Sequence, residues 1–395
     1  MKKFILGAIT LAAIFVLALF VVQAVAQAND GGSRKIVVFQ TGLNDAAKDE
    51  IIARAGGAKL KNLDLIGARA VWLPSKAAVE KLKTHSAVLR IDEDVEVFAL
   101  GRFEKSFTTL AQVLPWGIDR IDAELVWPSG NTADPIKVGI IDTGISNTHP
   151  DLLANVKGGV NTINSRKKWN DDNGHGSHVA GIVAALNNTV GVVGAGPLAD
   201  LYAIKVLNAA GSGYLSDVIE GIEWAITKNM QVINMSLGTT SDIQSFHDAV
   251  TAAKTAGIVV VAAAGNSGGS VIFPAAYPEA IAVSATGENN VIASWSSRGP
   301  AVDLAAPGVS IYSTYKGTSY ATLSGTSMAA PHVVGSAALV LNTPVGAYDV
   351  NPANGKWDPD EVQTKLQATA TNLGGDTGFD NLYGWGLVNA YAATQ

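Results

Sequence analysis

The sequence predicts an α/β protein with a mainly parallel sheet and helices on both faces, preceded by a small α+β domain. Between residues 111 and 395, short apolar runs of strand length alternate with longer segments of helical spacing, the pattern of a parallel sheet with crossover helices. Residues 34–99 show a shorter alternation of the same kind. The chain has 395 residues, of which 48% are hydrophobic, and can therefore bury the cores of two or three domains.

The composition excludes several classes of site. The formal net charge is −6, and no run of Lys and Arg suggests a basic surface, so we expect no nucleic-acid partner. The chain has no Cys, which excludes both disulfide bonds and a Cys nucleophile. Stability must therefore come from packing, from bound ions, or from both.

The first 26 residues have the layout of a secretory signal peptide. Met1-Lys2-Lys3 supplies positive charge, residues 4–22 are apolar, and Ala24-Val25-Ala26 fits a small-x-small cleavage signal. A retained membrane anchor is the alternative, because the apolar run is close to the length that spans a bilayer. Both interpretations predict export: the first gives a secreted, extracellular protein, and the second keeps it at the cell surface.

Residues 34–99 are predicted to fold as a small domain of β-α-β-β-α-β order. Three of its four strands are expected at 35–40, 68–73 and 88–98, and its helices at 44–55 and 75–82. Asn44 or Asp45 caps the first helix, and Ser75 caps the second. Residues 100–110 are polar apart from Phe103 and Phe107, which predicts an exposed linker.

The larger domain, residues 111–395, accounts for most of the predicted sheet. Its strands are expected at 136–141, 201–207, 232–235, 258–263, 280–286 and 303–306. Its helices are expected at 179–186, 215–228 and 243–256. The apolar, Ala-rich run 333–341 predicts a further, buried helix with Ser327 at its N-terminal end.

Four polar residues fall where such a sheet presents its functional groups. Asp142 directly follows the strand at 136–141, and Asn266 follows the strand at 258–263. His175 stands between glycines just before a helix, and Ser327 stands where free backbone N–H groups favour developing negative charge. Each residue alone fits an ordinary turn or cap, but together they supply a carboxylate, a base, a nucleophile and an oxyanion donor.

Two other arrangements fit these residues less well. His175 and His178 have the spacing of zinc ligands, but no nearby Glu or Cys completes a ligand set. An esterase on an α/β sheet would need a G-x-S-x-G turn and the order Ser, acid, His, whereas Met328-Ala329 follows Ser327 here. A non-catalytic protein of the same fold would lack one of the reactive residues, and all are present.

The motifs around these residues are VGIIDTGI at Asp142, NGHGSHVAG at His175, NMSLG at 234–238, AAAGN ending at Asn266, and GTSMAAPH at Ser327. With them the chain resembles the subtilisins, the secreted serine endopeptidases of the subtilase superfamily, over nearly all of 111–395. The resemblance implies that Ser327 attacks the scissile carbonyl, His175 transfers its proton, and Asp142 orients His175. It also implies that Asn266 and the backbone N–H of Ser327 form the oxyanion hole.

The resemblance further implies a cleft that takes protein and peptide substrates as an added strand. The two flanking segments are Gly211-Ser212-Gly213 and Ser236-Leu237-Gly238. The first pocket, for the residue before the cut bond, is lined by Leu237, Ala263, Ala264 and Gly265, and Leu215 belongs to the fourth pocket. Such linings favour apolar or aromatic side chains.

By the same resemblance, residues 34–99 are a propeptide that assists folding of its own enzyme and inhibits it. The stretch from Thr109 to Gly117 resembles a maturation junction, which predicts self-cleavage between Leu110 and Ala111. Leu110 would then occupy the first pocket and Phe107 the fourth. The mature enzyme, residues 111–395, is expected to be a monomer.

Two Ca²⁺ sites are predicted, and no organic cofactor is expected. By resemblance, the first uses the side chains of Gln112, Asp151 and Asn188 and the carbonyls of Leu186, Val190 and Val192. Gln112 is expected to settle there only after the chain is cut. The second is an EF-hand-like loop whose Glu falls one position late, with Asp349, Asn351, Asn354, Asp358 and Glu361 as ligands. A polar insertion before an N-capped helix is the alternative.

Overall fold

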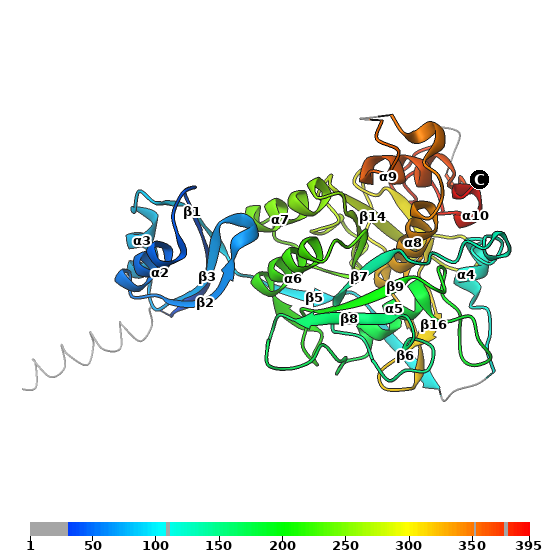
Figure 1. The fold of residues 1–395 in the computed structure, drawn as a ribbon, viewed down its shortest axis with the longest axis horizontal. Helices are drawn as coiled ribbons and strands as arrows, with labels where there is room; N and C mark the ends of the chain where they lie inside the picture. The colour runs from blue at the N-terminus through cyan, green and yellow to red at the C-terminus, as the bar shows by residue number, and fades with distance from the viewer. Residues whose placement is uncertain (1–30, 108–110, 351–352, 375–377) are drawn as a thin grey trace, which may run out of the picture. The chain divides into compact units, whose positions relative to one another are not determined.

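The structure is a computed structural model, and it describes residues 31–107, 111–350, 353–374 and 378–395 (Figure 1). The predicted signal segment, residues 1–26, lies outside the described residues. The chain divides into two compact units, residues 1–94 and 95–395. This boundary falls before residue 99, the predicted end of the small domain.

The smaller unit has the predicted β-α-β-β-α-β order. Its antiparallel sheet has the strand order β2-β3-β1-β4. The strands are β1 (Ser33–Phe39), β2 (Ala58–Leu63), β3 (Ala68–Leu73) and β4 (Val88–Glu93), and the helices are α2 (Asp45–Arg54), α3 (Lys76–Lys83) and a 3₁₀ turn at Asp64–Ile66. The side chains of Asn44 and Ser75 accept hydrogen bonds from the N–H groups of Ala47 and Ala78. The first helix is therefore capped by Asn44 rather than Asp45, and the predicted cap Ser75 is confirmed.

The larger unit is built on a parallel sheet with helices on both faces, which confirms the predicted fold class (Figure 1). Across the sheet the strands are β15 (Leu304–Pro307), β14 (Ala280–Thr286), β13 (Val259–Ala263), β11 (Val232–Met235), β7 (Lys137–Asp142), β9 (Asp200–Lys205) and β8 (Val156–Asn161). Helices α5 (His175–Ala184) and α8 (Thr326–Leu341) cover one face, and α6 (Leu215–Thr227) and α7 (Gln244–Thr255) cover the other.

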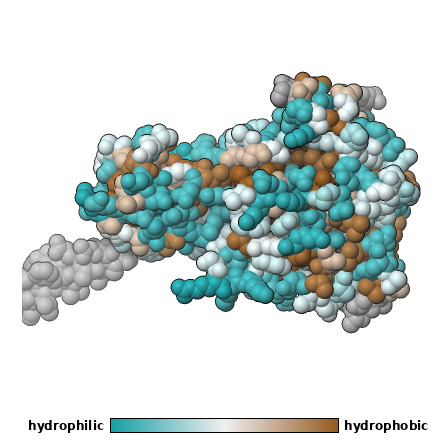
Figure 2. Space-filling model, in the orientation of Figure 1, coloured by the Kyte–Doolittle hydropathy of each residue, from teal (hydrophilic) through white to brown (hydrophobic). Residues whose placement is uncertain are grey.

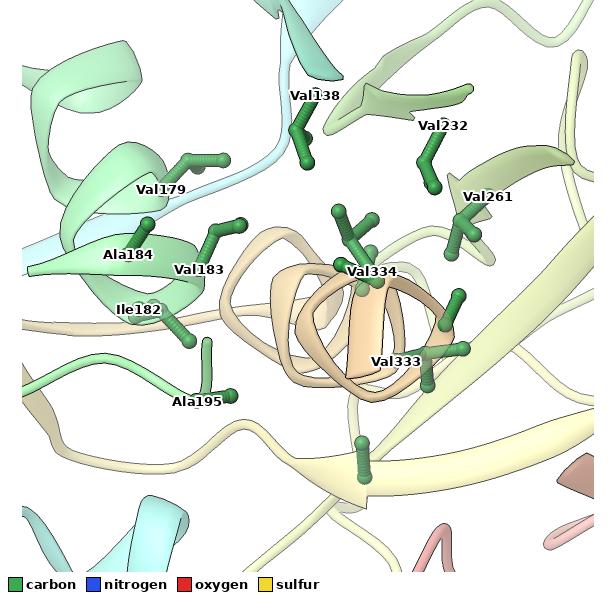
Figure 3. Close-up of a cluster of buried hydrophobic side chains, with 14 of the residues drawn as sticks. Val138, Val179, Ile182, Val183, Ala184, Ala195, Val232, Val261, Val333 and Val334 are labelled. Atoms are coloured by element: carbon green, nitrogen blue, oxygen red, sulfur yellow. The ribbon is translucent and has the colours of Figure 1, made fainter. Parts of the chain in front are cut away.

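Helix α8 is the centre of the core. Every residue from Thr326 to Val340 is buried. Figure 3 shows Val333 and Val334 of α8 among Val138, Val232 and Val261 of the sheet and the apolar side chains of α5. Burial of this many aliphatic groups is the main stabilising term for the unit, and it fixes the helix that carries Ser327.

Several short strands are not apparent from the sequence. They are β5 (Glu96–Ala99), β6 (Arg102–Phe107), β10 (Ser212–Tyr214), β12 (Leu237–Gly238), β16 (Ile311–Thr314) and β17 (Tyr320–Ser324). The predicted strand at 88–98 is therefore two strands, of which β5 belongs to the larger unit, and the predicted linker contains β6. Both pair with segments more than 100 residues away, and local sequence patterns carry no information on such pairing.

The remaining helices of the described chain are short and lie at the edges of the larger unit. They are α4 (Trp116–Arg120), α9 (Pro359–Ala368), α10 (Ala390–Ala393) and 3₁₀ turns at Trp127–Ser129 and Gly346–Tyr348. Within the described ranges, no helix is both long and apolar enough to cross a bilayer. The visible face of the larger unit carries apolar patches set among polar ones (Figure 2).

Candidate active site

Asp142 and His175 form a buried pair at the carboxyl edge of the sheet. Asp142 ends β7, His175 begins α5, and the His175 Nδ1 lies 2.8 and 2.9 Å from the two Asp142 carboxylate oxygens. Burial lowers the pKa of His175, but the charge and hydrogen bond of Asp142 outweigh it, so this pKa lies above its ordinary value. The Nε2 atom has no hydrogen-bond partner among the described residues. It is therefore free to accept a proton.

The loop before α5 is held by Asp171, whose role was not predicted. Its carboxylate accepts hydrogen bonds from the hydroxyls of Thr143 and Ser177 and from three backbone N–H groups, those of Asn173, Gly174 and Ser177. Thr143, next to Asp142, in turn accepts the N–H of Gly176. Asp171 thus ties the Asp142 strand to the His175 helix. The adjacent Asp-Asn-Gly turn signal was the only sequence indication.

Ser327 is the second residue of α8, and Ser236 fixes its backbone. Pro331 has no N–H to donate to the carbonyl of Ser327, four residues earlier. The Ser236 hydroxyl takes this place and donates to the Ser327 carbonyl over 2.9 Å. In return, the Ser327 hydroxyl donates to the Ser236 carbonyl over 3.0 Å. The missing helix hydrogen bond at Pro331 thus couples Ser327 to the segment before β12.

Asn266 is oriented by Thr326. Its side-chain oxygen accepts both the backbone N–H and the hydroxyl of Thr326, each over 2.9 Å. The amide nitrogen therefore faces away from α8, and it donates to the carbonyl oxygen of Leu100. Asn266 is a donor aimed at a peptide carbonyl, which is the geometry that an oxyanion hole requires.

Residues 95–100 lie in the predicted substrate cleft. Strand β5 pairs antiparallel with β10 on one side and with β12 on the other. Ala99 donates to the Gly211 carbonyl over 2.9 Å, and Leu100 donates to the Ser236 carbonyl over 3.2 Å. Ser212, Gly213, Leu237 and Gly238 pair with this strand, and Leu215 donates to the Val95 carbonyl. The two predicted flanking segments therefore enclose a strand of the chain itself.

The side chains of this segment alternate between protein and solvent. Leu100 packs against the main core of the larger unit, and Val97 is 0% exposed, whereas Phe98 is 48% exposed. The predicted pocket residues Ala263, Ala264 and Gly265 follow one another at the carboxyl end of β13 and lead directly to Asn266. Counted back from Leu100 as the first residue, the cleft thus partly buries the first residue and fully buries the fourth.

The peptide bond between Leu100 and Gly101 lies among the reactive groups. Asn266 binds its carbonyl oxygen, and a Cβ added to Gly101 would lie 2.9 Å from the His175 Nε2. The residue after the bond therefore has almost no room for a side chain. Asn266 and His175 therefore both lie at this one peptide bond.

Of the two predicted processing residues, the structure describes only Ala111. Leu110 lies outside the described residues, and Ala111 forms a β-bridge with Val190 in the predicted calcium loop. The backbone of Phe107 pairs with that of Tyr320 in β17. Val97 is the fourth residue counted back from Leu100, and it pairs with Gly213 in the cleft. Leu100 and Leu110 are both apolar, and only strand pairing distinguishes them.

The residues of the first predicted calcium site come together. The Gln112 amide nitrogen donates to the carbonyls of Leu186 and Val192 over 2.8 and 3.1 Å, and Asn188 donates to Asp151 over 2.8 Å. Val190 lies in the same loop, opposite Ala111. Rotating the Gln112 side-chain amide by half a turn would direct its oxygen to the same point. The oxygen atoms gathered at this loop therefore suit a hard cation as ligands. Gln112 reaches this loop in the uncut chain, contrary to the expectation that cleavage must come first.

In the second predicted calcium loop, the described carboxylate oxygens accept hydrogen bonds from backbone N–H groups of the same segment. Asp349 accepts the N–H groups of Asn354 and Gly355, and Glu361 accepts those of Val350 and Asp358. Asp358 and Glu361 form a capping box on α9, as the alternative interpretation predicted. Asn351 lies outside the described residues. Among the described residues, no group of three or more His, Asp or Glu side chains is arranged to hold a metal.

Comparisons with known proteins agree with this geometry. Residues 133–386 match the family described as the Subtilase family. The chain is 47% identical to an "Alkaline protease" of Shouchella clausii over 80% of this chain and 77% of that protein. It is 49% identical to "Subtilisin Savinase" of Lederbergia lenta over 72% of this chain and 100% of that protein. It is 41% identical to "Subtilisin E" of Bacillus subtilis over 99% of this chain and 98% of that protein.

Proposed function

Because this chain belongs to the subtilase family and is a serine endopeptidase, we propose that it cuts peptide bonds with a Ser327-His175-Asp142 triad. Ser327 Oγ attacks the carbonyl carbon while His175 Nε2 takes the hydroxyl proton, and Asp142 stabilises the resulting imidazolium. Asn266 Nδ2 and the Ser327 N–H donate to the oxyanion. The C–N bond then breaks, and the leaving amine takes the proton from His175. Water hydrolyses the Ser327 ester in a second cycle.

A single observation supports this proposal: one of the chain's own peptide bonds lies against Asn266 and His175. The Leu100 carbonyl accepts from Asn266, and the residues before it bind as a strand between β10 and β12. We infer that the precursor cuts itself between Leu100 and Gly101. The partly buried Leu100 and the buried Val97 support a preference for apolar residues at the first and fourth positions before the cut.

The remaining roles follow from the order of the chain. Residues 1–26 direct export of an extracellular enzyme, and the unit that ends at Asp94 assists folding and then inhibits the enzyme through the attached strand β5. The whole of "Subtilisin Savinase" aligns with 72% of this chain, which supports a catalytic part that functions without the preceding residues. The substrates are proteins and peptides, and the mature enzyme is a monomer without a nucleic-acid partner.

A calcium ion is proposed at the loop that contacts Gln112. Gln112, Asp151 and Asn188 would hold it with side-chain oxygens, and Leu186, Val190 and Val192 with carbonyls. When bound, the ion would neutralise Asp151 and stabilise the loop. The melting temperature of the Ser327→Ala protein should then fall when calcium is chelated, and Gln112→Ala should reduce that fall. A second ion at 349–361 stays a prediction.

The proposed function is tested with the precursor lacking residues 1–26, as wild type and as Ser327→Ala. Each product is examined by N-terminal sequencing and intact mass after refolding with calcium. We expect a wild-type product that starts at Gly101 beside an uncut variant. If both proteins remain uncut, the catalytic role of Ser327 is wrong. Cleavage of both at the same bond would assign the cut to another protease.

A further inference from the structure

We propose that residues 101–107, here called the strap, remain bound along β17 after the first cut and keep the enzyme partly latent until they are removed. This inference rests on the proposed cleavage between Leu100 and Gly101. It adds a second stage to activation, in which the side of the cleft that receives the leaving half of a substrate is blocked by the new N-terminus of the enzyme.

The strap occupies the strand edge next to the nucleophile. Its strand β6 pairs antiparallel with β17, from Arg102 opposite Ser324 to Phe107 opposite Tyr320. Only Gly325 and Thr326 separate β17 from Ser327. The opposite edge of β17 is taken by β16. A bound substrate whose leaving half continued along β17 would need the same backbone groups that the strap uses.

Side chains also fasten the strap. The register shifts between Thr322 and Leu323, and Glu104 lies at this irregularity. The Glu104 carboxylate accepts from the hydroxyl of Ser310 over 3.1 and 3.2 Å and also from that of Ser324. The ring centroids of Phe103 and Tyr315 lie 5.7 Å apart. Charge-assisted hydrogen bonds exceed neutral ones in strength, so the Glu104 carboxylate is a strong side-chain attachment of the strap.

The far end of the strap remains covalently anchored after the cut. Ala111 pairs with Val190, and the Val113 N–H donates to the Gly191 carbonyl over 2.9 Å. The strap is thus a tethered ligand, with an effective concentration of about 1 mM or more. Even a segment with a dissociation constant of about 1 mM would stay bound half of the time. Strand β5 has no such link to the catalytic unit once Leu100 is released.

Two kinds of substrate distinguish this state from ordinary inhibition by the propeptide. A peptide p-nitroanilide places only a small aromatic amine beyond the cut bond and can bind beside the strap. An internally quenched peptide with six residues beyond the cut bond must displace it. Propeptide remaining in the non-leaving half of the cleft inhibits both substrates alike, so the ratio of the two rates reports the strap alone.

The experiment follows this ratio during maturation of the wild type, Glu104→Ala, Phe103→Ala and the control Glu288→Ala. Glu288 is an exposed acid in a loop between β14 and β15. Intact mass identifies enzyme that starts at Gly101 and enzyme that has lost the strap. We expect the ratio of peptide to p-nitroanilide hydrolysis to be about tenfold lower while the strap is attached. Glu104→Ala and Phe103→Ala should raise it severalfold, and Glu288→Ala should not.

Each possible result supports or overturns a stated part of the proposal. An equal ratio for enzyme with and without the strap would overturn the proposal, although a product starting at Gly101 would still support self-cleavage. Equal ratios for Glu104→Ala and Glu288→Ala, with the strap attached, would overturn the fastening by Glu104. A product that never starts at Gly101 would overturn both the strap and the proposed first cut.

Discussion

Strands β5 and β6 lie on either side of one peptide bond, yet the protein binds them differently. Strand β5 pairs on both edges, with β10 and β12, and buries Val97 completely. Strand β6 pairs on one edge only, and the side chains of Arg102 to Ser106 are exposed. The residues before the bond that we propose to be cut are therefore bound by burial and by strand hydrogen bonds on two edges. The residues after this bond are held by strand hydrogen bonds on one edge, by Glu104 and by their covalent link to Ala111.

The largest effect should come from the bond where the two strands meet. Asn266→Ala removes the donor to the Leu100 carbonyl, and we expect kcat to fall by about 10²–10³, the magnitude established for this asparagine in subtilisin itself. The rate of the first cut and of peptide hydrolysis should fall together, because both form the same oxyanion. Steady-state kinetics on a p-nitroanilide substrate measure this. A loss confined to KM would show that Asn266 only binds the ground state.

A smaller effect on the rate of the first cut should distinguish a buried position of β5 from an exposed one. Val97→Asp would place a charge at a fully buried position and should slow the first cut about 100-fold, because desolvation of an unpaired carboxylate is costly. Phe98→Asp is the matched control at a half-exposed position and should change the rate less than about threefold. The rates are read from mass spectra during refolding. Equal slowing by both variants would contradict the alternation.

The smallest effect should appear in the pH dependence of the first cut. On the acid side, we expect the cleavage rate to fall about tenfold for each pH unit. His175 must be neutral to accept the Ser327 proton, and Asp142 raises the pKa of His175 despite its burial. The base is therefore protonated at pH values where an ordinary His is still neutral, and the midpoint of this fall should lie above about pH 6.5. A pH series of the cleavage rate tests this, and a midpoint below about 6.5, the ordinary pKa of His, would contradict the raised pKa.

Two other histidines provide a control for that series. Burial lowers the pKa of His178 to about 3 and that of His332 to about 4. Both stay neutral in the fold but take protons in the unfolded chain below about pH 6.5, so their contribution to stability is lost as the pH falls from there towards 4. Urea unfolding of Ser327→Ala across the series separates this loss of stability from the change in rate.

The sequence by itself determined the fold class and the chemical groups of the site. Apolar runs of strand length, helical spacing and the caps Asn44 and Ser75 are local patterns, and each appears in the structure. Asp142, His175, Asn266 and Ser327 could be found because strand ends and helix starts are local features that a parallel sheet gathers at one edge.

Only the tertiary structure decided which bond the site receives and what holds the site together. Leu100 and Leu110 offer similar side chains, and the choice of Leu100 depends on β5 pairing with residues 211–214 and 236–238. The tertiary structure likewise decided the pairing of β6 with β17, the hydrogen bonds that Asp171 accepts from the start of α5, and the contact of Gln112 with its loop in the uncut chain. These contacts join segments distant in sequence, and their register is fixed by hydrogen bonding and burial in the folded chain rather than by local preference.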